Sequence, residues 1–111
     1  MFGFSRKPAH REVSPAQLDA LLRQQAAIIV DVREPDEFAA GHIPGASNLP
    51  LSRFDPAALP AAAGKTLILS CAGGKRSAMA LDRCAVAEAN VETHLAGGFG
   101  AWKAAGLPVA Q

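Results

Sequence analysis

Hydrophobic positions fall into short blocks along the chain, and the composition of each block predicts a strand or a helix. The run 28–32 is β-branched and apolar except for Asp31, which is typical of a strand that is covered on both faces. A second apolar run begins at Leu67 and ends at Cys71, and it predicts another strand. Shorter strands are predicted at residues 11–13, 47–49 and 91–95.

Polar residues between these runs predict helices through their capping patterns. Ser14, Pro15 and Gln17 match an N-cap, a proline in the first turn and a capping box. Val13 and Leu18 are spaced for a hydrophobic staple across that helix start. Further helices are predicted at residues 34–40, 77–89 and 99–105.

The order of these elements predicts an α/β fold. Strands that alternate with helices form a parallel sheet with helices on both faces. Residues 50–64 contain Pro56 and Pro60 among alanines, so we expect at most a helical turn or two there. Because the loops after parallel strands gather at one edge of a sheet, the turns at 31–33, 71–76 and 97–102 should converge.

Size and composition limit the organisation of the chain. Half of its 111 residues are apolar, which is enough for one core without disulfides, and the net charge of +1 gives no general attraction to nucleic acid. Two cysteines at unlike positions favour a reducing compartment, and hence a cytoplasmic location. We expect a flexible leader at 1–10 and a single domain at 11–111.

The leader contains no apolar run long enough for a signal peptide or a membrane span. Its Phe2 and Phe4 leave an alternative open, in which this segment touches a membrane or docks on a partner.

The junction at Cys71 is the strongest candidate for chemistry. Backbone N–H groups of a small-residue loop and a helix N-terminus favour negative charge, and Lys75 and Arg76 add positive charge there. Such a cysteine should have a lowered pKa and act as a nucleophile. The alternative is a structural cysteine in an ordinary strand-to-helix turn. Cys84 follows on the apolar face of a helix, where we expect a buried and unreactive thiol.

Two other titratable residues are interpreted as structural. Asp31 ends a buried strand two residues before Arg33, and an ion pair that holds the loop is favoured over proton transfer. His42 follows a glycine in a turn, and a turn-fixing hydrogen bond is favoured over a general base.

Four motifs resemble the rhodanese (sulfurtransferase) family, and its single-domain members in particular. They occur in the same order as in that family, over about residues 11 to 109. The resemblance implies a three-layer α/β/α sandwich around a five-stranded, mainly parallel sheet. One departure is visible, because Glu88 and Ala89 stand where the family often has a glycine–aromatic pair, which leaves the helix end open. The motifs are residues 31–38, residues 41–50, the Cys71 loop and residues 95–102.

The resemblance also implies a reaction, in which Cys71 attacks the sulfane sulfur of a donor such as thiosulfate and forms a persulfide. A thiol or cyanide acceptor then removes the sulfur, and the acceptor can also be a protein. No metal or organic cofactor is expected, since no cluster of side chains has ligand spacing, and neither a nucleic acid nor a membrane partner is expected. The implied persulfide-binding loop consists of Ala72, Gly73, Gly74, Lys75 and Arg76, and the supporting residues are Asp31, Arg33 and Ser77.

Loop length distinguishes the chemistries known on this fold. From Cys71 to Arg76 the loop has six residues, similar to sulfur-transferring rhodaneses, whereas the related dual-specificity phosphatases have one residue more to surround a phosphate. A phosphatase or arsenate reductase is therefore the less favoured enzyme. The other alternative is a non-catalytic rhodanese-like module that binds or regulates a partner, although such modules usually lack the cysteine.

Overall fold

The computed structural model describes residues 10–111, which form one five-stranded sheet in the order β1-β5-β4-β2-β3. All neighbouring strands are parallel, so the predicted α/β fold with a parallel sheet is confirmed. Most of the predicted leader, residues 1–9, lies outside the described residues. The strands are β1 (Arg11–Val13), β2 (Ala27–Asp31), β3 (Ser47–Asn48), β4 (Thr66–Ser70) and β5 (Thr93–Leu95).

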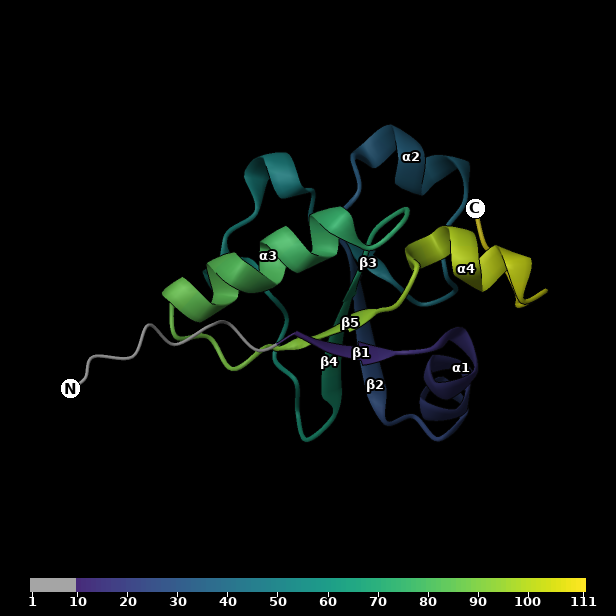
Figure 1. Ribbon diagram of the computed structural model, residues 1–111, viewed down its shortest axis with the longest axis horizontal. Coiled ribbons are helices and arrows are strands. Elements are labelled where there is room, and N and C mark those ends of the chain that lie inside the picture. Colours follow the sequence, from purple (N-terminus) through teal and green to yellow (C-terminus); the bar gives the residue numbers. More distant parts are fainter. Residues whose placement is uncertain (1–9) are drawn as a thin grey trace.

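Helices cover both faces of this sheet, with α3 on one side and α1 and α4 on the other (Figure 1). Two short 3₁₀ turns occupy the proline-containing connection, as expected. Within residues 10–111, no helix is long and apolar enough to cross a lipid bilayer. The helices are α1 (Pro15–Arg23), α2 (Pro35–Ala40), α3 (Lys75–Val86) and α4 (Gly98–Ala104), and the 3₁₀ turns are η1 (Leu51–Arg53) and η2 (Pro56–Ala58).

The central strands are buried on both faces, because side chains along a strand alternate between two cores. In β4, Leu67 and Leu69 pack in the core beneath α3, while Ile68 packs in the core with α1 and α4. Each fully buried aliphatic side chain contributes roughly 1.5–3 kcal/mol to folding relative to an exposed one. Trp102 belongs to the second core, is 1% exposed, and donates from Nε1 to the Pro108 carbonyl at 2.7 Å.

The capping box predicted at the start of α1 is present. The Gln17 N–H donates to Ser14 Oγ at 3.1 Å, and the Ser14 N–H donates to Gln17 Oε1 at 2.8 Å. Two backbone donors that the helix itself cannot satisfy are thereby satisfied.

The predicted bounds of α3 were wrong at both ends. The helix begins at Lys75 instead of residue 77, because Gly74 at φ +109° acts as the N-cap without any side-chain cap. It ends at Val86 instead of residue 89, because Glu88 adopts the left-handed conformation at φ +56°. Lys75 therefore belongs to the first helical turn and not to an open loop.

The end of α3 has the hydrogen bonds of a Schellman motif with a non-glycine residue in the left-handed position. The Ala89 N–H donates to Cys84 O at 2.8 Å, and the Glu88 N–H donates to Ala85 O at 3.0 Å. Glycine is the residue that normally occupies this place, since it has no Cβ to be strained.

Replacing Glu88 with glycine should therefore stabilise the protein. Relief of the left-handed strain should exceed the entropy that glycine adds to the unfolded chain, for a gain of about 0.5–1 kcal/mol. Urea unfolding of both proteins measures the difference. Glu92→Gly is the matched control, because it removes a glutamate outside such a turn, and it should not stabilise the protein. Equal gains in both variants would contradict the strain argument.

Candidate active site

Cys71 lies directly after the carboxyl end of β4, and its sulfur is surrounded by donors from the following turn. The Gly74 N–H donates to Sγ at 3.0 Å and the Ser77 N–H donates to it at 3.3 Å. Ser77 Oγ lies 3.5 Å from the same sulfur. Because Cys71 is only 1% exposed, these groups replace water as the partners of the sulfur.

These contacts favour the thiolate over the thiol. Burial raises the pKa of Cys71, but hydrogen bonds from the Ser77 hydroxyl and from the N–H groups of Ser77, Gly74 and Gly73 lower it by more. The pKa of Cys71 therefore lies below its ordinary value. The other thiol differs, since burial alone raises the pKa of Cys84, which is fully buried on the inner face of α3 as expected.

The first turn of α4 closes over the Cys71 loop, so two of the predicted converging turns meet. The Phe99 N–H donates to Cys71 O at 2.7 Å and the Gly100 N–H donates to Ala72 O at 3.0 Å. A Cβ on Gly98 would lie 2.4 Å from Cys71 O, so only glycine permits this approach. The backbone of the loop is thus fixed from outside as well as by α3.

Asp31 and Arg33 form the predicted ion pair, and both are buried. Arg33 Nη2 donates to Asp31 Oδ2 at 2.8 Å and to Gly41 O at 2.7 Å, and the guanidinium carbon lies 4.5 Å from the centre of the Phe99 ring. The pair therefore ties the end of β2 to the end of α2 and to the turn that closes the Cys71 loop.

Arg76 is engaged by an acid on another element. Its two terminal nitrogens donate to the Glu37 carboxylate at 2.7 and 2.9 Å, in a bidentate pair between α3 and α2. Hydrogen bonding by Arg76 lowers the pKa of Glu37 to about 2. Lys75, in contrast, is exposed at the start of α3. Of the two predicted cations, Arg76 is therefore largely neutralised by Glu37, whereas Lys75 faces solvent.

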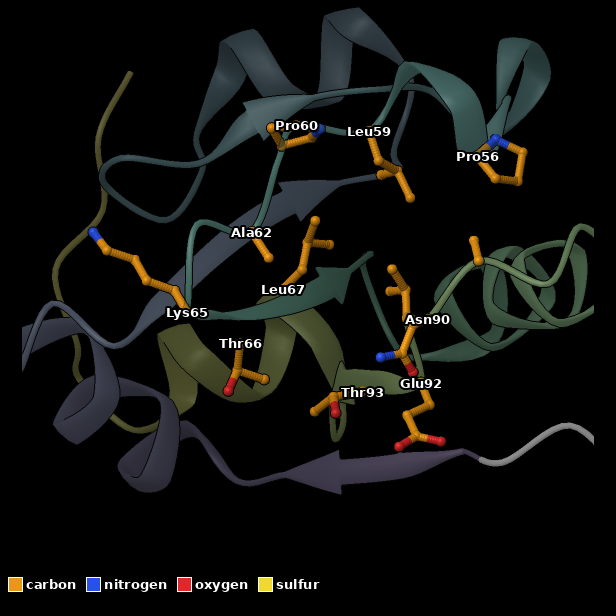
Figure 2. Close-up of a pocket in the computed structure, with 12 residues that line it drawn as sticks. Pro56, Leu59, Pro60, Ala62, Lys65, Thr66, Leu67, Asn90, Glu92 and Thr93 are labelled. Carbon is orange, nitrogen blue, oxygen red and sulfur yellow. The ribbon is translucent and has the colours of Figure 1, made fainter.

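A hollow of about 360 Å³ lies beside the loop, and Ala72 of the loop forms part of its wall. The rest of the wall combines two cations and one acid with apolar side chains. A larger hollow of about 400 Å³ lies at the amino ends of β4 and β5, away from Cys71, as the positions of Thr66 and Thr93 in Figure 2 show. The hollow beside the loop is lined by Arg33, Glu37, Ala40, Gly41, Ala72, Phe99, Gly100, Lys103 and Val109.

His42 takes the structural place expected for it. Its Nδ1 lies 2.8 Å from Phe38 O, and its ring stacks on the Phe38 ring with centroids 3.8 Å apart. Within residues 10–111, no three His, Cys, Asp or Glu side chains are grouped so that they could hold a metal ion.

Comparison with known proteins identifies the family. The family model described as the rhodanese-like domain matches residues 14–105, which is most of the chain. The chain belongs to the rhodanese-like domain family. The thiol after β4 and the first turn of α4 that closes over the loop both lie within the matched part of this rhodanese-like domain.

Relatives of this rhodanese-like domain include proteins with and without a described activity. An uncharacterized Synechocystis protein, slr1261, is 48% identical over 99 residues, which cover 89% of this chain and 55% of that protein. The chain thus spans about half the length of this relative. The thiosulfate sulfurtransferase GlpE of Ectopseudomonas mendocina is 34% identical over 94 residues, which cover 85% of each protein. A rhodanese-related protein from Thermoplasma volcanium superposes with a TM-score of 0.76 at 30% identity, covering 91% of this chain and 98% of that one.

Two residues of the rhodanese-like site were missed from the sequence. Glu37 was assigned only to a helix start, and nothing near it in the sequence indicates its partner 39 residues away. His94 was read only as part of a strand, yet its Nδ1 lies 2.7 Å from Ser77 Oγ in the interior. A polar residue in the middle of an otherwise buried strand was the available signal.

The Glu37–Arg76 pair predicts a pH dependence of stability. Because the pKa of Glu37 is depressed, its stabilisation is complete above the ordinary value of 4.5 and is lost as the pH falls through about 2. Glu37→Gln should therefore be less stable at neutral pH, by up to about 1 kcal/mol for a half-exposed pair, and equal to wild type in strong acid.

Unfolding by urea at a series of pH values measures this difference. Asp36→Asn, which removes the neighbouring exposed carboxylate, is the matched control and should not reproduce the acid-dependent loss. A Glu37→Gln deficit that persists unchanged into strong acid would show that packing, and not charge, stabilises this contact.

Proposed function

We propose that this rhodanese-like domain is a sulfurtransferase that moves a sulfane sulfur from a small anionic donor to a thiol or cyanide acceptor through a persulfide on Cys71. The observation that supports this most directly is the pair of backbone N–H groups, from Gly74 and Ser77, directed at a buried Sγ with a lowered pKa. A thiolate held in this way is a nucleophile, and the same donors stabilise the negative charge of a persulfide.

The reaction takes place in two balanced steps. With thiosulfate as donor, the Cys71 thiolate attacks the outer sulfur, the S–S bond of thiosulfate breaks, and sulfite leaves with the electron pair. The product is a Cys71 persulfide anion. Cyanide or a thiolate then attacks the outer sulfur of the persulfide, the new S–S bond breaks, and the Cys71 thiolate is restored. The protein ends each cycle unchanged, which is a ping-pong mechanism.

The surroundings of Cys71 suit a small anion. Lys75 is exposed at the start of α3, and Lys103 Nζ lies 5.0 Å from the centre of the Phe99 ring at the hollow beside the loop. These cations can attract a donor anion without being fixed in an ion pair as Arg33 is. Both cysteines are free, which suits a reducing, cytoplasmic environment.

Similarity supports the same activity, because the GlpE proteins of Ectopseudomonas mendocina and Pseudoalteromonas translucida carry the name thiosulfate sulfurtransferase. The Pseudoalteromonas translucida protein is 30% identical to this chain, and the match covers 92% of its length. The similarity therefore extends over nearly the whole of a protein with that name. A small anionic donor and a thiol or cyanide acceptor, which can also be a protein thiol, are part of the proposal.

The activity is tested by offering the protein two substrates in parallel. Thiocyanate should form from thiosulfate and cyanide, whereas an aryl phosphate should be hydrolysed negligibly, because a six-residue loop leaves too little room for a tetrahedral phosphate. Efficient phosphate release with no thiocyanate would establish the phosphatase alternative. Inactivity toward both, together with no persulfide after incubation with thiosulfate, would favour a binding module.

A further inference from the structure

The Ser77 hydroxyl has one proton and three polar neighbours. Its Oγ lies 3.5 Å from Cys71 Sγ, 3.1 Å from Gly74 O and 2.7 Å from His94 Nδ1. The contact with His94 is the shortest, and the thiol, the hydroxyl and the imidazole are all buried, with Ser77 fully buried and His94 4% exposed. The thiol and the imidazole are therefore joined by a single hydroxyl group.

The sheet register places this imidazole between the thiol and the surface. In the register, β5 pairs His94 with Glu12 of β1 on one side and with Leu69 of β4 on the other. Leu69 belongs to the core beneath α3, and residues paired across parallel strands share a face, so all three point toward α3. The other ring nitrogen of His94, Nε2, lies 3.6 Å from Glu12 Oε2, whose side chain is 61% exposed.

The remaining titratable groups that face His94 are few within the described chain. The His10 ring lies 6.0 Å from the His94 ring, and Nε2 of His10 lies 2.7 Å from Asp82 Oδ1 of α3. Glu12 faces it from β1, and Cys71 faces it through Ser77. The acid at Nε2 favours a proton on that nitrogen, which leaves Nδ1 free to accept the hydrogen of the Ser77 hydroxyl.

We propose that His94 is the base that accepts the proton of Cys71, through the Ser77 hydroxyl, when the nucleophile forms. The Sγ–H bond breaks and this proton moves to Ser77 Oγ, while the proton of Ser77 moves to His94 Nδ1. The products are a thiolate and an imidazolium, and no electrons are gained or lost. Afterwards Nδ1–H donates to Oγ, Ser77 O–H can donate to the thiolate, and Nε2–H faces the Glu12 carboxylate.

The electrostatics agree with this role. Burial lowers the pKa of His94, the Glu12 carboxylate partly opposes this, and His10 adds to it. While Cys71 still carries its proton, a lowered pKa favours the neutral imidazole of His94, which is able to accept that proton. The charges that the transfer creates are opposite and close, so they stabilise each other where little water screens them. This inference rests on the proposed function only in treating Cys71 as the nucleophile.

The proposal is tested by titrating Cys71 in the absence of any sulfur donor. The ultraviolet absorbance of the thiolate and the rate of alkylation by iodoacetamide are followed against pH, in a Cys84→Ala background so that one thiol is observed. In His94→Asn the amide can still hydrogen-bond to Ser77 but cannot take a proton. The Cys71 midpoint should rise by about one pH unit, because a positive charge within a few ångströms is lost.

Two further variants make the result specific. Glu12→Gln should raise the midpoint by a smaller amount, and should have no further effect when combined with His94→Asn. His42→Asn removes a histidine whose ring stacks on Phe38 and whose Nδ1 lies near Phe38 O, and it is the matched control that should leave the midpoint unchanged. Because Glu12 is exposed, its substitution remains informative even if His94→Asn does not fold.

Linkage provides a second measurement, since the two groups must affect each other equally. In nuclear magnetic resonance titrations the His94 ring should titrate about one pH unit lower in Cys71→Ser than in the wild type. Unchanged Cys71 midpoints in folded His94→Asn and Glu12→Gln, or an unchanged His94 titration in Cys71→Ser, would overturn the relay. None of these measurements requires sulfur transfer, so failure of the proposed function and failure of the relay are separate outcomes.

Discussion

Replacing Cys71 with serine should reduce thiocyanate formation by at least ~10³-fold and should prevent any gain of sulfur by the protein. Loss of an enzyme nucleophile costs on the order of 10⁶ in kcat in well-studied hydrolases, and a serine hydroxyl has no lowered pKa to replace the thiolate. Intact-protein mass spectrometry after incubation with thiosulfate measures the added sulfur, and a peptide digest should place it on Cys71.

Cys84 is the matched control for this substitution, because it is the other cysteine of the chain. It is 0% exposed and burial raises its pKa, so it is neither accessible nor ionised. Cys84→Ala should retain both the added sulfur and the turnover, at a stability cost of about 1 kcal/mol for the small cavity. If Cys84→Ala abolished turnover in a folded protein, Cys84 would be a resolving thiol and the mechanism would include a disulfide.

The second large effect is expected at Gly98, where the closing turn meets the Cys71 loop. A Cβ there would lie 2.4 Å from Cys71 O and 2.6 Å from the Ala72 carbonyl carbon, and the backbone has φ +61°. Strain at this φ and displacement of backbone each cost about 1–3 kcal/mol. Gly98→Ala should therefore lose about 2–6 kcal/mol of unfolding free energy, measured by urea denaturation.

Two other glycines separate the causes. Gly45 has φ +85° with nothing within 4 Å of an added Cβ, so Gly45→Ala should show the conformational cost alone, about 1 kcal/mol. Gly73 has open space and no left-handed φ, so Gly73→Ala should change stability by less than about 0.5 kcal/mol. If Gly98→Ala were no worse than Gly45→Ala, the turn and the loop would not be packed against each other as described.

Local patterns predicted most of the fold because each depends on neighbouring residues. The capping box at Ser14 forms between residues three positions apart, so the sequence alone predicts it. The β-branched run of β2 can pack against any apolar layer, so the sequence alone also predicts this buried strand. The start of α3 was misplaced because its N-cap is a glycine, which has no side chain to indicate a cap. Its end was misplaced because Glu88 adopts a conformation that its residue type disfavours.

The candidate site was predicted only in its local part. The Cys71 loop is continuous in sequence, and so its amides, glycines and cations could be recognised together. The pairing of Arg76 with Glu37 and the contact of Ser77 with His94 join different elements, and they follow from the packing of α3 against its neighbours. No periodicity or spacing encodes such contacts, because they depend on which faces meet after folding.

The bonds between the closing turn and the Cys71 loop have a consequence for synthesis on the ribosome. The chain is synthesised from its N-terminus, so β2, β3 and β4 are made before Phe99 and Gly100, whose N–H groups bond to the carbonyls of the Cys71 loop. Those bonds cannot form until Phe99 and Gly100 have left the exit tunnel. Strand β1 has to wait almost as long for β5, its neighbour in the described sheet. The loop that surrounds the thiol is therefore completed among the last steps of folding, and the nascent chain passes through a stage with a thiol but without its finished enclosure.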